Sequence, residues 1–236
     1  MKVPMSSLRL ICRLLPILAA LSLQACATTQ TYSAKPITAT VVDAETGEPL
    51  EAVNVAAHWV LHDPVAWRSA GDLELTETAT DKEGKFHFPG WKGKAPPVVE
   101  QYETRLSNED PAMIFFKSGY RPRSVGNYLQ PERLRDDNHT WERYSDWDGK
   151  VIKLEKVKGN LEDYGNIVDG ITRGLGSGIK CGWKKTPRLY ASLINEKERL
   201  DKLGVRNNLP SMATMQYYFD IQKCGSAKDF FREYLK

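Results

Sequence analysis

The hydrophobic residues of this chain change their spacing near residue 157, and this change limits the possible folds more than any other feature. From about 36 to 156 they tend to recur at every second position between turn residues, which indicates half-buried strands. From 157 to 236 they recur at every third or fourth position, which indicates amphipathic helices. Because the helices follow the strands as a block, the pattern predicts an α+β protein.

The first of these regions, residues 36–156, is predicted to form an antiparallel β-sandwich of short strands. We expect strands at 37–43, 51–62, 73–80, 85–88, 112–116 and 151–155. Within 51–62, alternate residues form one apolar face: Val53, Val55, Ala57, Trp59 and Leu61. Turn residues lie at 44–49 and 81–84. Several short strands with regular turns are typical of a sandwich.

The second region, residues 157–236, is predicted to be a small helical region. Asn160, Thr186, Ser211 and Ser226 are each placed to start a helix, and Pro187 suits the first helical position after a Thr186 hydroxyl cap. The apolar stripes of these helices can pack on each other or on the sandwich. Two arrangements stay open: a separate subdomain, or an appendage that covers a sheet edge.

The first 25 residues have the composition of a secretory signal peptide. They contain three basic residues and no acidic ones, and residues 14–23 are apolar but too short to span a bilayer. The sequence Leu23-Gln24-Ala25-Cys26 that follows resembles the lipobox of bacterial lipoproteins. That resemblance implies cleavage before Cys26, acylation of this residue and attachment to a lipid bilayer.

The same resemblance also implies where the protein is located in the cell. Ala27 stands where Asp often causes retention in the inner membrane, which implies the outer membrane, with the protein on its periplasmic face. Residues 26–35 then form a short polar tether. The alternatives are ordinary secretion, with Cys26 as a thiol or disulfide partner, and a chance match to the motif.

The chain has four cysteines, and their positions predict one disulfide. Cys12 leaves with the leader and Cys26 takes the lipid, so Cys181 and Cys224 remain in an oxidising compartment. We therefore expect a bridge within the helical region. Two buried free thiols are the alternative, and a metal site is disfavoured because no histidine lies near either cysteine in sequence.

The net charge of the chain disfavours nucleic acid as a partner. The formal charge is +3, from 33 basic and 30 acidic residues, and the three basic residues of the leader account for all of it. The remaining chain is neutral and has its two signs interspersed.

The strand region resembles a known family. Residues 37–43, then Thr46-Gly47-Glu48-Pro49-Leu50, are similar to the opening of carboxypeptidase regulatory-like domains, as are 80–88 and 118–122 to later parts of that family. The resemblance implies a transthyretin-like sandwich. Ala39 and Ala52 replace glycines usual in the family, and the insertions at 62–72 and 91–111 are long. The shared residues are structural, so they imply no catalytic role.

Candidate chemistry elsewhere is sparse, and we expect no metal, no cofactor and no enzymatic activity. His58 and His62 share a face of a predicted strand, but a metal site needs a third ligand such as His87, and solvent-facing histidines are the simpler interpretation. Residues 174–178 are rich in glycine but lack the lysine of a phosphate loop, so a flexible connection is expected.

One aromatic and acidic segment, residues 139–148, is a candidate contact site. Trp141, Tyr144 and Trp147 suit a sugar or a protein surface, and Glu142 with Asp146 is a weak candidate for a glycosidase pair. The alternative is a loop whose aromatic residues anchor it to the sandwich. The sequence favours a non-catalytic binding or scaffolding module that contacts another envelope protein, with a glycan-binding module as the alternative.

Overall fold

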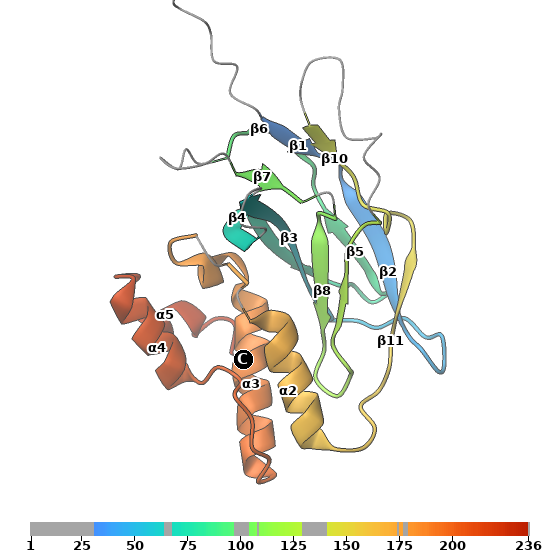
Figure 1. Ribbon diagram of the computed structural model, residues 1–236. Helices are drawn as coiled ribbons and strands as arrows, with labels where there is room; N and C mark the ends of the chain where they lie inside the picture. Colours follow the sequence, from blue (N-terminus) through green and yellow to red (C-terminus); the bar gives the residue numbers. More distant parts are fainter. Residues whose placement is uncertain are drawn as a thin grey trace, which may run out of the picture. The chain divides into compact units, whose positions relative to one another are not determined.

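The computed structural model describes residues 31–63, 68–96, 104–107, 109–128, 141–173, 175–176 and 179–235 (Figure 1). Thr31–Lys236 is one compact unit. The predicted signal peptide and Cys26 lie outside the described residues. The described strands are β1 (Tyr32–Ala34), β2 (Ile37–Asp43), β3 (Asn54–Asp63), β4 (Arg68–Ala79), β5 (Lys85–Phe88), β6 (Trp91–Lys94), β7 (Arg105–Leu106), β8 (Ala112–Phe116), β9 (Arg123–Val125), β10 (Trp141–Arg143) and β11 (Val151–Leu154).

The strands form three sheets, and most neighbours are antiparallel as predicted. Their orders are β10-β1-β6, β11-β2-β5 and β4-β3-β8-β9, with β7 paired to β3. Two pairs differ from the prediction, because β11 runs parallel to β2 and β10 runs parallel to β1. Each of these parallel neighbours is separated from its partner by about a hundred residues of chain, which allows the crossover that a parallel pair requires.

The sandwich core lies between the β3-containing sheet and the sheet of β2, β5 and β11. The predicted apolar face of β3 points into it, with Val55, Ala57, Trp59 and Leu61 all buried. Phe86 and Phe88 of β5 enter the same cluster, while His87 between them is exposed. The period of two therefore places the β3 face and the β5 face as predicted, and the β-sandwich is confirmed.

The N-terminal strand β1 shortens the predicted tether. The sequence predicts a polar tether over residues 26–35, but Tyr32 and Ala34 are buried in the sandwich core. Strand β1 lies between β6 and β10, and Tyr32 Oη accepts a hydrogen bond from the Leu106 backbone at 3.3 Å. A period-two pattern only three residues long gives no signal against the polar residues around it.

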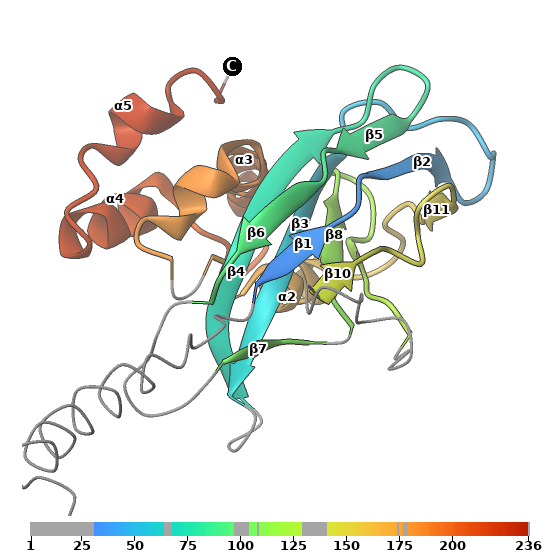
Figure 2. The same ribbon diagram turned by 90° about the horizontal axis from the view of Figure 1, so that it is seen from above.

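Helices cover the second face of the β3-containing sheet, as Figures 1 and 2 both show. α2 (Leu161–Thr172) and α3 (Pro187–Lys202) pack on this face, and the short 3₁₀ helix η2 (Gly182–Lys185), α4 (Met212–Ile221) and α5 (Ala227–Phe231) complete the helical region. Ile114 and Phe116 of β8 pack in one cluster with Tyr164 of α2 and Leu193 of α3. Of the two arrangements left open, the helices thus lie against the sandwich, but over a face and not an edge.

Three of the four predicted helix starts have the expected side-chain cap. Asn160 accepts from Glu162 N, Ser211 from Thr214 N, and Ser226 from Asp229 N. Thr186 precedes α3 as predicted, but the prediction that its hydroxyl caps the helix is wrong.

The carboxylate of Glu77, from β4, caps α3 instead. It accepts hydrogen bonds from Arg188 N at 2.7 Å and Leu189 N at 3.0 Å. Burial raises the pKa of Glu77, although these hydrogen bonds and the nearby Arg188 oppose the shift. A charged oxygen at a helix N-terminus satisfies free N–H groups and interacts favourably with the helix dipole, so it takes the place of the Thr186 hydroxyl.

A third cluster holds α4 and α5 together. Trp183 of η2, Phe219 of α4 and Phe231 of α5 are all buried in it, beside Cys224. Among the helices that the structure describes, none combines the length and apolar character needed to cross a bilayer.

Candidate functional site

A surface groove of about 530 Å³ lies where the sandwich meets α2. Its walls come from the turn after β2, the bend before β9, the chain that leaves β11, and the first turns of α2. The lining residues are Ala44, Glu45, Arg121, Glu155, Lys156, Val157, Lys158, Asn160, Asp163, Tyr164 and Ile167. A second, more open groove of about 380 Å³ shares Arg121 and Glu155 and adds Arg123 and Lys153.

Backbone hydrogen bonds fix two walls of this junction groove. Arg121 N donates to Glu155 O at 2.7 Å, and Val157 N donates to Gly119 O at 2.9 Å. These bonds clamp the bend before β9 against the strand end of β11. The Asn160 cap then turns the chain directly into α2, so that α2 forms the opposite wall.

The buried carboxylate of Asp43 lies beside the groove and binds several neighbouring groups. It accepts from the backbone of Glu45 and Thr46, from Tyr120 Oη at 3.0 Å and from Lys156 Nζ at 3.2 Å. The two backbone hydrogen bonds contribute most to holding its pKa far below the usual range, Tyr120 and Lys156 add to them, and burial opposes them. Asp43 in turn raises the pKa of Lys156, which stays protonated and is a poor nucleophile.

Other charges on the groove wall stay available to a ligand. Lys158 is an exception, because it pairs with Glu45. In the part of the chain that the structure describes, the side chains of Arg121, Glu155 and Asp163 make no hydrogen bond or ion pair. Free charges of both signs in one groove suit a polar protein surface or peptide, and the arrangement offers no paired acid and nucleophile.

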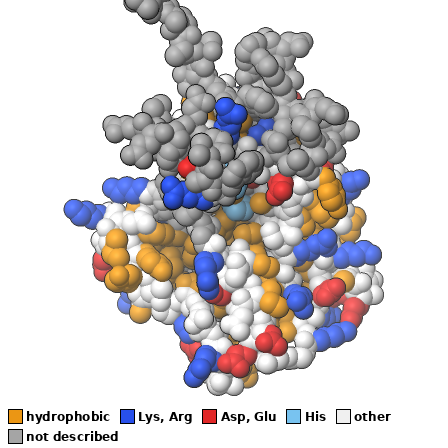
Figure 3. All heavy atoms as spheres, in the orientation of Figure 1, with side chains coloured by type: hydrophobic (Ala, Val, Ile, Leu, Met, Phe, Trp, Pro, Cys, Tyr) orange, Lys and Arg blue, Asp and Glu red, His pale blue; other side chains and the backbone are white. Residues whose placement is uncertain are grey.

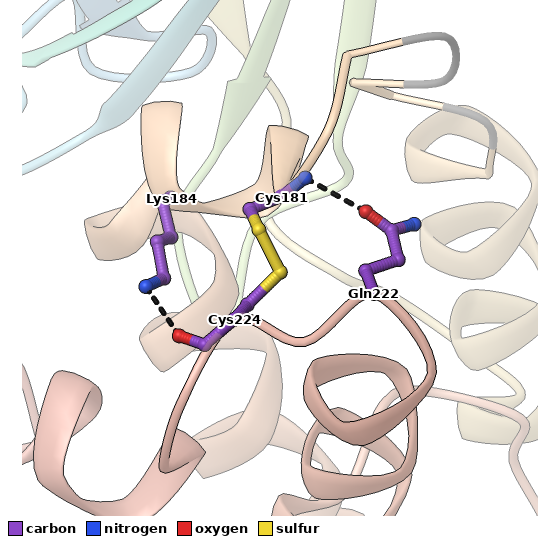
Figure 4. Close-up of a disulfide and its surroundings, with 4 residues drawn as sticks. All are labelled: Cys181, Lys184, Gln222 and Cys224. Carbon is purple, nitrogen blue, oxygen red and sulfur yellow. Dashed lines mark hydrogen bonds between the residues drawn. A yellow bond between two sulfur atoms is a disulfide. The ribbon is translucent and has the colours of Figure 1, made fainter.

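The expected disulfide is present. Cys181 and Cys224 are bonded, with their Cα atoms 6.1 Å apart, and the bridge joins the segment before η2 to the chain after α4 (Figure 4). Two hydrogen bonds flank it. Cys181 N donates to Gln222 Oε1 at 2.7 Å, and Lys184 Nζ donates to Cys224 O at 2.6 Å (Figure 4).

The predicted aromatic contact residues lie near the opposite end of β11, and the fold uses at least one of them. Trp147 Nε1 donates to Gly126 O at 2.9 Å, and the Arg123 guanidinium lies 5.3 Å from the centre of the Trp147 ring. Tyr144 O accepts from Asn127 at 2.6 Å. Trp141 lies in β10, and its side chain is outside the described residues.

The acidic residues of that segment are engaged separately. Asp146 Oδ2 accepts from Tyr128 N at 2.9 Å, whereas Glu142 lies 3.3 Å from Lys35 Nζ. Each carboxylate thus serves a different local contact, and this segment binds residues 126–128 to the sandwich rim.

The histidines occupy separate environments. His58 Nδ1 lies 3.2 Å from Asp72 Oδ1, and only 18% of its side chain is exposed, so the expectation of a solvent-facing residue is wrong for His58. His87 of β5 contacts Thr38, its neighbour on the adjacent strand β2 of the same sheet, at 2.9 Å. No group of three His, Cys, Asp or Glu able to hold a metal ion occurs among the described residues. Within the glycine-rich connection, Gly176 N donates to Asp72.

The sequence analysis missed Glu196, a buried acid of α3. It accepts a hydrogen bond from Ser118 and a two-pronged contact from Arg199, and 1% of the residue is exposed. Burial raises its pKa, but the hydrogen bonds from Arg199 and Ser118 outweigh it and leave the pKa below its usual value. Its position in the sequence could have indicated burial, because Glu196 lies three residues after Leu193 and four before Leu200, on the apolar stripe of the helix.

Comparisons with known proteins leave the family open. No protein-family model matches the chain, and no curated protein sequence matches it. Among solved structures, 3-chlorocatechol 1,2-dioxygenase from Rhodococcus opacus has 17% identity and a TM-score of 0.30 over 57% of this chain and 63% of its own. The C-terminal domain of the shaft pilin SpaA from Lactobacillus rhamnosus has 15% identity and a TM-score of 0.24 over 54% of this chain and 99% of its own. At this level of similarity, these comparisons support no statement about activity or partners.

Proposed function

We propose that this protein is an envelope lipoprotein, held to the periplasmic face of the outer membrane through acylated Cys26, that binds another envelope protein without catalysis. The junction groove is the observation on which the binding role rests. It presents Arg121, Glu155 and Asp163, whose side chains make no hydrogen bond or ion pair among the described residues, on rigid walls. A preorganised set of charges of both signs selects a partner by electrostatic complementarity.

The sandwich is proposed to be of the transthyretin-like type found in carboxypeptidase regulatory-like domains. One backbone feature supports this proposal. Ala52, which replaces a glycine usual in the family, has a φ of +57°. Only glycine adopts this region without strain, so the backbone at this position suits the glycine that is usual in the family.

The alternative role, glycan binding, has less support. A sugar platform needs an open aromatic face, whereas Arg123 lies over the Trp147 ring and the indole N–H is bonded to Gly126. We therefore place the proposed contact at the junction groove and not at Trp147.

The lipid anchor is tested with Cys26→Ser in cells that are fed a fatty-acid analogue. We expect the label in the wild-type protein and none in the variant, since the thiol carries the diacylglycerol. Cys12→Ser is the matched control and should keep the label. Continued labelling of Cys26→Ser would contradict the anchor.

The binding role is tested by crosslinking in intact cells from a photoreactive residue at Asp163. A single protein adduct is expected there and not from Lys92, an exposed residue of β6 outside the groove. Reversing a free charge by Glu155→Lys should reduce the adduct from Asp163. Equal adducts from Asp163 and Lys92, or no effect of Glu155→Lys, would overturn the groove as the contact site.

A further inference from the structure

Helix α4 carries an exposed apolar stripe. Tyr217, Tyr218 and Ile221 are 62%, 45% and 59% exposed, and Ile221 lies three and four residues after the two tyrosines, on one helical face. Figure 3 shows hydrophobic side chains gathered over α4 and α5. The opposite face of α4 is occupied, because Met215 and Phe219 are buried in the cluster with α5. The packing of α4 against its neighbours in the protein therefore does not require this stripe.

The stripe rests on a rigid support. Trp183 lies behind it, with ring centroids 6.0 Å from Tyr218 and 5.4 Å from Phe219. The Cys181–Cys224 disulfide ties the end of α4 to η2, so the aromatic face is held in one orientation (Figure 4). A preformed surface loses less conformational entropy when it docks.

The charge of the mature chain is divided unevenly along the sequence, and the part that contains α4 is cationic. Residues 179–236 contain 12 Lys and Arg against 6 Asp and Glu, a net charge of +6. Residues 26–178 contain 18 against 24, a net charge of −6. The helical end is thus cationic although the mature chain as a whole is neutral, and its field favours an anionic surface.

Two lysines lie at the C-terminal end of the stripe. The hydrogen bond between Cys181 and Gln222 brings together their chain neighbours Lys180 and Lys223, both of which are exposed. Asp220 is an exposed acid on α4, and its carboxylate is bonded to Gln216 at 2.7 Å. Tyrosines beside lysines are the combination that favours a membrane–water interface, where the ring enters the headgroup layer and the ammonium group meets phosphate.

We propose that the exposed face of α4, formed by Tyr217, Tyr218 and Ile221 with Lys180 and Lys223, binds the surface of an anionic phospholipid bilayer. This contact is separate from the junction groove. The proposed anchor at Cys26 is separated from Tyr32 by at most about 20 Å of chain, and the α4 contact does not require it. The anchor would hold the body close to lipid, and the α4 face would then set its orientation.

Vesicle flotation tests the proposal without the anchor. The protein is residues 27–236, which contains the whole compact unit and has no lipid. We expect it to float with vesicles of phosphatidylethanolamine and phosphatidylglycerol, and not with phosphatidylcholine alone. Lys180→Glu should lower the partition coefficient by at least about fivefold, since one basic residue near an anionic surface contributes that factor. Tyr217→Ala with Ile221→Ala should lower it by about tenfold or more.

The matched control removes exposed apolar side chains away from α4. Leu203→Ala with Val151→Ala alters residues that are 58% and 53% exposed, and this variant should float like the parent. An intact disulfide and an unchanged near-ultraviolet spectrum establish the fold of each variant. Equal flotation with both vesicle types, no flotation, or an equal loss in the control would overturn the proposal. None of these results bears on the labelling of Cys26, so failure of the anchor is distinguished from failure of the α4 contact.

Discussion

The two faces of the β4-β3-β8-β9 sheet are buried by different means. One face meets the other sheets of the sandwich through alternating apolar residues. The other meets α2 and α3 through an apolar cluster to which polar ties are added: Glu77 to the α3 N-terminus, Ser118 to Glu196, and Asn54 to Ser192 at 2.8 Å. Apolar contact supplies much of the stability of both interfaces, whereas directional hydrogen bonds also fix where the helices lie.

The sandwich and the α4–α5 cluster are expected to differ most when a buried core residue is truncated. Phe115→Ala in the sandwich and Phe219→Ala in the α4–α5 cluster each remove a fully buried ring and should cost about 3–5 kcal/mol. Phe115→Ala should reduce amide protection throughout the unit, because β8 contacts both layers. Phe219→Ala should reduce it mainly in α4 and α5, which hydrogen-exchange mass spectrometry resolves. Equal loss of amide protection in β3 in both variants would mean that the sandwich and the α4–α5 cluster unfold together.

The disulfide is expected to have the next largest effect. It closes a loop with a sequence separation of 43 residues, and loss of such a bridge costs about 2–4 kcal/mol. Cys181→Ser with Cys224→Ser should lower the free energy of unfolding in guanidinium by this amount. The change in exchange should be confined to η2, α4 and α5. Unchanged stability would show that the hydrophobic cluster around Trp183 holds this region without the bridge.

Glu77→Gln weakens one polar tie between the layers. The amide keeps one acceptor oxygen and replaces the other with an N–H group, so the α3 N-terminus loses one hydrogen bond, and we expect a loss of about 1 kcal/mol at neutral pH, measured by denaturant unfolding. Glu74→Gln, three residues earlier in β4, is the matched control. It should cost less, because Glu74 pairs with the partly exposed Lys94 and caps no helix.

The pH dependence gives this variant a second readout. The folded-state pKa of Glu77 lies above its ordinary value of 4.5, so the folded protein binds more protons there than the unfolded chain does. This group therefore makes stability fall as the pH rises from about 4.5 through the folded pKa. Glu77→Gln should remove that part of the slope. A slope identical to the parent's in this interval would contradict the role of Glu77.

Much of the fold is predictable from local patterns. The alternation in β3 and β5 and the caps Asn160, Ser211 and Ser226 each depend on residues near one another in sequence. Strands β1, β6, β7, β9 and β10 escape prediction, because their two to four residues show no clear apolar alternation, unlike the equally short β5 with Phe86 and Phe88. Short strands acquire their structure from their partners, and a sequence window does not contain those partners.

The junction groove is not predictable in the same way. Arg121, Glu155 and Asp163 come from three separate elements and share no motif spacing. Local chemistry favours a Thr186 cap, but Glu77 replaces it from more than a hundred residues away. The predicted Trp147 contact has the right residue type, and the sandwich rim uses it. Sequence patterns therefore do not predict the long-range polar contacts of this chain.

Ala52→Gly should produce the smallest effect, and it acts on the sandwich alone. Ala52 has a φ of +57°, an arrangement that costs a residue with a Cβ about 1–2 kcal/mol. Glycine removes this strain but adds about 0.5–1 kcal/mol of unfolded-state entropy, so the net gain is about 0.5–1 kcal/mol. Ala39→Gly is the matched control, because Ala39 is buried in β2 and its truncation should destabilise. Opposite signs for the two variants in thermal unfolding would show that the backbone favours glycine at position 52 and not at position 39, which would support the proposed transthyretin-like relationship at position 52. If Ala52→Gly also destabilised, the left-handed backbone at Ala52 would not be strained, and it would no longer support the proposed relationship.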